Sequence, residues 1–204
     1  MTYNDFTLRK IQTKFGISNK VMPLFKNIVP QTMSDSLKED LEIAKTLPVR
    51  SEKAKSELIV MPILIEMMKK NQHFFTIYSG DTLTADRESG LQGECDFILA
   101  KNTETFNINT PIITLVEAKR DNIEIGIPQC AAQMIGASIY NKKYGSELDE
   151  IYGCVTTADN WIFLKLKDDV IFIDNQKYYL GNVEELLGVF QCIVDIFKEK
   201  FKSK

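Results

Sequence analysis

The sequence predicts an α/β fold in which a mixed central sheet is flanked by helices. A helical pattern precedes three apolar strand patterns, and a second helical pattern and a fourth strand pattern follow them. The 204 residues suit a single domain, residues 1–204, that buries its own core. A hydrophobic content of 44% and a charged content of 26% are ordinary for a globular protein.

Residues 1–50 predict an N-terminal helical or irregular extension. Residues 1–33 mix apolar and polar positions without sustained periodicity, which indicates an irregular cap with one short helix. Residues 34–45 predict a short amphipathic helix with Ser34 as its N-cap. These residues indicate no role for the extension.

The predicted core, residues 51–181, begins with the strongest helix pattern of the chain. Residues 51–71 carry an apolar stripe at helical spacing, and Glu57 lies almost on it. Pro62 removes one backbone hydrogen bond and should kink this helix. Two interpretations of Glu57 stay open: a ligand for a metal or its water, and a boundary glutamate paired with Lys53.

The remaining patterns complete the core and add a C-terminal part. Strands are predicted at residues 74–79, 96–100, 112–118 and 151–157, with a helix at 128–143 that has Pro128 in its first turn. An extra hairpin turns at residues 158–160, edge strands follow at 170–174 and 177–180, and residues 182–204 hold a final amphipathic helix. Trp161 is expected in the core.

Two of the predicted strands carry charged residues inside apolar runs. Asp96 opens one strand, and Glu117 and Lys119 lie at the end of the next. Because successive side chains of a strand point to opposite faces, Glu117 and Lys119 share a face. Buried charge is costly unless it is paired or binds a metal, so we interpret the three residues as a functional set. Metal-assisted hydrolysis of a phosphodiester bond is the chemistry that needs this set.

An aspartate at a strand start, followed by Glu-x-Lys on the next strand, resembles the active-site signature of the PD-(D/E)XK nuclease superfamily. The nearest likeness is to the N-terminal nuclease domain of type I restriction enzyme R subunits and to small stand-alone bacterial relatives. The resemblance covers the predicted core, and Cys95 stands where the motif name expects proline. It implies a restriction-endonuclease-like αβββαβ core.

The resemblance also implies a catalytic set of Asp96, Glu117 and Lys119. Asp96 and Glu117, with the backbone carbonyl of Ala118, would bind Mg²⁺, for which Mn²⁺ can substitute. Glu57 would hold a second ion or its water. Lys119 would orient the attacking water and offset charge on the phosphate.

The helix after the Glu-x-Lys strand adds supporting candidates. Gln129, Gln133 and Tyr140 fall on one helical stripe that includes Gly136, and they are similar to a glutamine and a tyrosine of several superfamily branches. They could bind phosphate or support Lys119. The alternative is a helix that packs through its alanines, with this polar side in water.

The leading interpretation is a metal-dependent nuclease, endo- or exonucleolytic, acting on DNA in bacterial defence or DNA processing. The alternative is a non-catalytic nucleic-acid or protein-binding module that retains the nuclease fold. Nucleic acid is the expected partner, with a homodimer or a partner subunit for target recognition left open. The net charge of −3 argues against a protein that coats nucleic acid.

Other classes are excluded by what the sequence lacks. No apolar run approaches the roughly 18 residues of a membrane span, and the first residues do not resemble a signal peptide, so we expect no membrane association and a cytoplasmic location. The four cysteines show no Cys-x-x-Cys spacing, and His73 is the only histidine. A zinc site and a histidine-based triad are therefore not expected.

Overall fold

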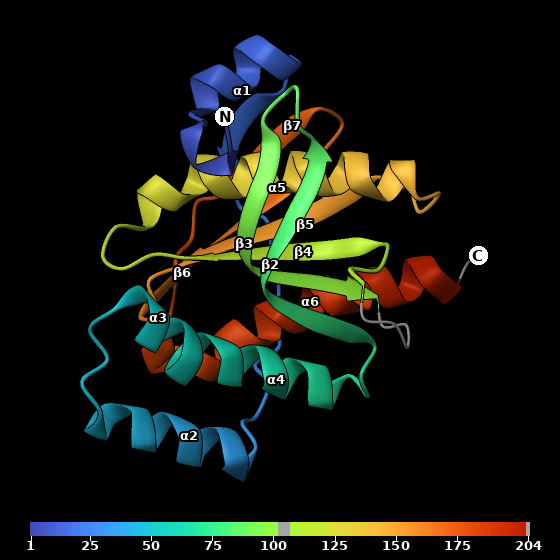
Figure 1. Cartoon of the computed structure of the whole chain (residues 1–204). Helices are drawn as coiled ribbons and strands as arrows, with labels where there is room; N and C mark the ends of the chain where they lie inside the picture. The colour runs from blue at the N-terminus through green and yellow to red at the C-terminus, as the bar shows by residue number, and fades with distance from the viewer. Residues whose placement is uncertain (102–106, 203–204) are drawn as a thin grey trace.

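The computed structural model describes residues 1–101 and 107–202, so the last two residues of the predicted C-terminal segment lie outside it. Within these ranges the chain forms an eight-stranded mixed sheet flanked by helices (Figure 1). The strands are β1 (Ser18–Met22), β2 (Phe75–Asp86), β3 (Leu91–Lys101), β4 (Ile112–Ala118), β5 (Glu150–Thr156), β6 (Asn160–Lys167), β7 (Val170–Asp174) and β8 (Tyr178–Tyr179). They lie in the order β1-β7-β6-β5-β4-β3-β2, and β8 pairs with β6. The β1–β7 and β4–β5 pairs are parallel.

The helices cover both faces of this sheet. They are α1 (Leu8–Phe15), α2 (Asp35–Thr46), α3 (Glu52–Lys55), α4 (Met61–Lys70), α5 (Ile123–Lys143) and α6 (Val183–Lys202), with short turns η1 (Tyr3–Asp5), η2 (Ser56–Val60) and η3 (Leu180–Asn182). Helices α2, α4 and α6 pack on one face, and α5 with α1 packs on the other (Figure 1). None of the helices described is long and apolar enough to cross a membrane.

The central strand β4 is buried along its whole length and has the predicted bounds. Its side chains alternate between the two layers: Val116 packs toward α4 and α6, and Leu115 packs toward α5. The element order from α3 through β2, β3, β4 and α5 to β5 is also as predicted. Trp161 lies in the core with no exposed surface, which confirms the expectation.

The hairpin of β2 and β3 is longer than predicted. Strands at 74–79 and 96–100 would leave an acidic loop between them, but this segment pairs almost to its tip, for example Asp81 with Cys95 and Leu83 with Gly93. The many polar residues of this segment hide the strand pattern. Buried Leu83 and Leu91, which pack beneath the N-terminal residues, hold the hairpin to the rest of the fold.

The N-terminal extension contributes a strand that the sequence did not indicate. β1 pairs in parallel with β7, so the prediction that residues 170–174 form an edge strand is wrong. β1 is itself the edge, and four of its five residues are exposed. A strand without a buried face has no alternation of apolar and polar residues, which is why the pattern missed it.

Two helices begin or continue differently from their predictions. α5 begins at Ile123, where Asn122 caps it by accepting the Glu124 N–H at 2.8 Å, so Pro128 lies inside the helix and not in its first turn. A proline near the start of a helix removes a single backbone bond, and packing on the sheet tolerates that loss. The predicted helix of residues 51–71 consists of α3, the π-helical turn η2 and α4, with the π turn ending just before Pro62.

Helix α2 is attached to α4 through one buried carboxylate. Ser34 caps α2, because its hydroxyl accepts the Leu37 N–H at 3.2 Å. The same hydroxyl donates to Glu66 Oε2 at 2.6 Å, and the Ser34 N–H donates to Glu66 Oε1 at 2.9 Å. Glu66 is 4% exposed, and the Lys70 ammonium lies 3.6 Å from it. The start of α2 is therefore fixed by bonds to a charged group, which are the stronger kind.

We expect Ser34→Ala to lower the free energy of unfolding by about 2 to 3 kcal/mol, because it removes both a cap and a bond to a buried carboxylate. Urea denaturation measures this loss. Ser51→Ala is the matched control: Ser51 caps α3 by accepting the Ala54 N–H at 3.0 Å but has no such acid behind it. The control should lose about 1 kcal/mol or less. Equal losses in the two variants would contradict the role of Glu66.

Candidate active site

Asp96 and Glu117 lie side by side on neighbouring strands. β3 and β4 pair Phe97 with Val116, and the next step of this antiparallel register places Asp96 beside Glu117. Asp96 Oδ2 accepts the Ala118 N–H at 2.7 Å. Since the N–H and C=O of one strand residue point to the same side, the Ala118 carbonyl is directed toward Asp96 as well.

Glu117 is the most deeply buried charged residue of the site. It is 1% exposed, and each of its carboxylate oxygens has a donor. Lys119 Nζ donates to Oε1 at 2.5 Å, and Gln133 Nε2, from α5, donates to Oε2 at 2.7 Å. The charge is therefore held by an ammonium on one side and an amide on the other, as a buried carboxylate requires.

Lys119 is positioned by its backbone and by a glycine. Its N–H donates to the carbonyl of Thr156 in β5 at 2.7 Å, which fixes the chain just after β4. Its side chain runs past Gly126 of α5, where an added Cβ would come within 3.1 Å of Lys119 Cγ and 2.5 Å of Val155 Cγ1. A residue without a side chain at position 126 therefore leaves the space that Lys119 occupies.

Helix α3 supplies an acidic residue that the sequence reasoning missed. The charge of Glu52 acts on both Asp96 and Lys119, and it raises the pKa of each. α3 is held at this end of the sheet because Lys55 Nζ donates to the carbonyl of Arg120 at 2.6 Å. The sequence feature that could have identified Glu52 is its position in the first turn of this helix, which lies near the ends of the strands.

Glu57, the acidic residue predicted from this helix, points elsewhere. Its side chain is 62% exposed, and its carboxylate lies 3.7 Å from Lys53 Nζ. This is the paired boundary glutamate that the sequence left open as an alternative. Glu57 follows Glu52 by five positions, which is well beyond one helical turn, so the two side chains do not share a direction.

The residues of the polar stripe predicted on α5 do not all lie at one site. Gln133 contacts Glu117, whereas Gln129 is half-buried one turn earlier. Tyr140 lies roughly 10 Å further along the helix. Its hydroxyl donates to the carbonyl of Ile108 at 3.5 Å, and its ring centroid is 4.6 Å from that of Tyr144. Tyr140 therefore lies near the C-terminal end of α5, whereas Lys119 lies beside the N-terminal end of this helix.

Burial is the main cause of the pKa shifts of the two acids of the site. Burial raises the pKa of Glu117 to about 7, and the neighbouring charge of Asp96 adds to the increase. Burial also raises the pKa of Asp96. Burial works to lower the pKa of Lys119, but the charge of Glu117 and its hydrogen bond outweigh this, so the net shift is upward. The site thus holds more acidic than basic groups and is short of positive charge.

The residues present fit a hard divalent cation. Asp96 and Glu117 offer carboxylate oxygens in a place where burial raises the pKa of both and the charge of Asp96 adds to the increase for Glu117, and a cation there would stabilise their ionised forms. Mg²⁺ prefers oxygen ligands and usually keeps several waters, so two carboxylates are a sufficient protein contribution. Across the described ranges no cluster of three or more His, Cys, Asp or Glu side chains suited to a metal is found.

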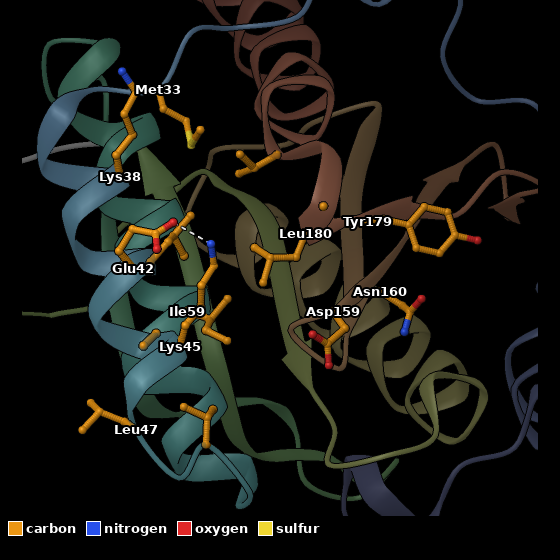
Figure 2. A pocket seen from close by; sticks show the side chains of 15 residues that line it. Met33, Lys38, Glu42, Lys45, Leu47, Ile59, Asp159, Asn160, Tyr179 and Leu180 are labelled. Carbon is orange, nitrogen blue, oxygen red and sulfur yellow. Dashed lines mark hydrogen bonds and ion pairs between the residues drawn. The ribbon is translucent and has the colours of Figure 1, made fainter.

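A separate groove of about 740 Å³ lies beside α2. Figure 2 shows α2 on one side of it, with the Glu42–Lys45 ion pair, and Asp159, Asn160 and Leu180 on the other. Its wall is mainly apolar, and it contains none of the three charged residues of the β4 site. This groove is therefore a second surface, distinct from the candidate active site.

Comparison with protein-family models and with curated proteins gives no match. The chemistry of the site is therefore inferred from the side chains that meet at the end of β4.

The raised pKa of Glu117 predicts how stability depends on pH. A group whose pKa rises on folding contributes stability below its unfolded value, here about 4.5, and loses it as the pH passes about 7. Relative to Glu117→Gln, the wild type should therefore lose about 3 kcal/mol of unfolding free energy between pH 4.5 and pH 8. Denaturation of both proteins across this range measures the difference. A difference between wild type and Glu117→Gln that stays constant across this pH range would refute the prediction.

Proposed function

We propose that this chain is a Mg²⁺-dependent nuclease of the restriction-endonuclease-like fold, a member of the PD-(D/E)XK superfamily, that hydrolyses phosphodiester bonds of DNA. One observation carries the proposal: Asp96, Glu117 and Lys119, from two adjacent strands, meet at the end of β4. The order of helices and strands around them agrees with the αβββαβ core that the fold requires. A role in bacterial defence or DNA processing is part of the proposal.

Asp96 and Glu117 would hold the metal, with the Ala118 carbonyl directed to the same place. A divalent cation bound there polarises the scissile phosphate and lowers the pKa of a bound water. Glu52 is a better placed helical acid than Glu57 for holding a water near the site, since its charge reaches both Asp96 and Lys119.

Lys119 has N–H donors that Glu117 does not use and that a substrate can accept. Its ammonium carries three N–H groups, and Glu117 Oε1 uses one of them. The others can donate to a phosphate oxygen or to the attacking water, and so stabilise charge that develops in the transition state. The contact with Gly126 and the bond to Thr156 restrict where Nζ can move.

Substrate binding by the chain alone should be weak. Arg120 follows Lys119 directly, and Lys55 links α3 to it, but Glu52 and Asp121 lie among these cations. Few phosphates can then be neutralised, and the net charge is −3. A second copy or a partner subunit that recognises the target is therefore part of the proposal.

A specific observation favours the alternative of a non-catalytic binding module. The α2 groove has the size of a ligand pocket and mainly apolar walls, and it needs none of the charged residues on β4. A module that works through this groove would tolerate loss of Lys119. An enzyme would not.

The metal proposal predicts a gain in stability. Mg²⁺ or Mn²⁺ at about one hundred times its dissociation constant should stabilise the fold by about 2.7 kcal/mol. For a domain of this size the melting temperature should rise by roughly 5 to 11 °C. Asp96→Ala should abolish the rise, and Glu57→Ala, which alters an exposed acid on the neighbouring helix, should keep it. A shift of equal size in wild type and Asp96→Ala would exclude the site.

The nuclease proposal predicts the effect of removing Lys119. Lys119→Ala should abolish most cleavage of DNA in Mg²⁺ or Mn²⁺ and leave DNA binding nearly unchanged, because the lost contacts are made in the transition state. Single-turnover cleavage and binding assays separate the two effects. Lys53→Ala, which removes an exposed lysine of the same region, is the control. Cleavage that survives Lys119→Ala would refute the mechanism, and a wild type that cuts neither DNA nor RNA would favour the binding module.

A further inference from the structure

Two buried polar atoms in the described part of the chain have no hydrogen-bond partner: the Tyr3 hydroxyl oxygen and Gln133 Oε1. Tyr3 is 1% exposed and Gln133 is fully buried. An unpaired buried polar group destabilises the folded state, so such groups are rare in native proteins. The two atoms are complementary, since a phenol can donate and an amide oxygen accepts.

The two side chains lie on the same face of α5. The Tyr3 hydroxyl occupies the space that a side chain at position 136 would fill, and Gly136 follows Gln133 by one helical turn. On its other side the Tyr3 ring lies 3.3 Å from where a Cβ of Gly93 would be. Gly93 and Gly136 thus form a slot between β3 and α5, and the first residues of the chain insert Tyr3 into it.

The two walls of this slot lie next to the active site. Gly93 lies three residues before Asp96 on β3, and Gly136 lies one turn after Gln133, which donates to Glu117. Burial raises the pKa of Tyr3 far above its ordinary value, so its phenol keeps the proton. The hydroxyl at the end of the slot is therefore a permanent donor.

The amide of Gln133 has one defined orientation at the site. Nε2 donates to Glu117 Oε2 at 2.7 Å, so Oε1 is directed away from that carboxylate. A rotation of the amide by half a turn would bring Oε1 against Glu117, oxygen facing oxygen. Whatever bonds to Oε1 from behind therefore determines whether Glu117 keeps its second donor.

We propose that Tyr3 is a positioning residue for the active site, whose hydroxyl donates through one internal water to Gln133 Oε1 and so keeps Nε2 facing Glu117. A single water suits the place, because it can accept from the phenol and donate to the amide oxygen. The link is a property of the fold, and only its consequence for catalysis rests on the proposed function. It also assigns a role to the N-terminal segment.

A double-mutant cycle on thermal stability tests the link. Tyr3→Phe should lower the melting temperature by about 2 to 4 °C in the wild-type background. In the Gln133→Met background it should have no effect or raise the melting temperature, because the hydroxyl has lost its partner. A rise in the wild-type background, or equal shifts in both, would overturn the proposal. Tyr178→Phe is the control: its hydroxyl donates to Asp174 at 3.2 Å on the other face, so its loss should be equal in both backgrounds.

A second measurement reports on the orientation of the amide. In Tyr3→Phe the side-chain amide protons of Gln133 should exchange with solvent roughly tenfold faster, while the backbone amides of α5 stay unchanged. Unchanged side-chain exchange would refute the link even if Gln133→Met fails to fold. If the chain cuts nucleic acid, Tyr3→Phe should lower turnover roughly tenfold or more with little change in KM. If it cuts none, the proposed function fails, and the cycle and the exchange rates still decide the link.

Discussion

The arrangement of this protein depends on one buried carboxylate. Glu117 sits in a strand whose residues are all buried, and water cannot solvate its charge. Such a group is tolerated only where donors meet its oxygens, and here Lys119 and Gln133 each meet one. Asp96 lies beside it and works in the opposite direction, since its charge adds to the effect of burial in raising the pKa of Glu117. A site that is short of positive charge is the physical basis for expecting a cation.

The topology explains how these donors reach Glu117. β4 and β5 are parallel neighbours, and α5 makes the crossover between them over one face. A crossover helix returns along the strand it has just left, so its residues pass over the end of β4. That path brings Gly126 beside Lys119 and Gln133 above Glu117. The same helix then carries Tyr140 away from the site, because a helix advances by about 1.5 Å per residue.

The two helical acids show what a periodicity argument can and cannot decide. Glu57 lies near the apolar stripe of its helix in sequence, yet its side chain is exposed and paired with Lys53. The π turn η2 inserts extra backbone at this point, so an ideal helical wheel misplaces residues on either side of it. The charge of Glu52 acts on the site because Lys55 attaches α3 to Arg120, a contact between residues far apart in the chain.

The sequence by itself determined the order of the core elements from α3 to β5, the bounds of β4 and the pairing of charges on one strand face. These follow from local periodicity, which the residues carry within a single element. Only the tertiary structure decided that Gln133 and not Tyr140 contacts Glu117. It also decided that the charge of Glu52 acts on Asp96, and that β1 forms the edge strand beside β7. The physical reason is that each of these depends on how separate elements approach one another. β1 in particular has no buried face of its own, so its place is set by its backbone bonds to β7.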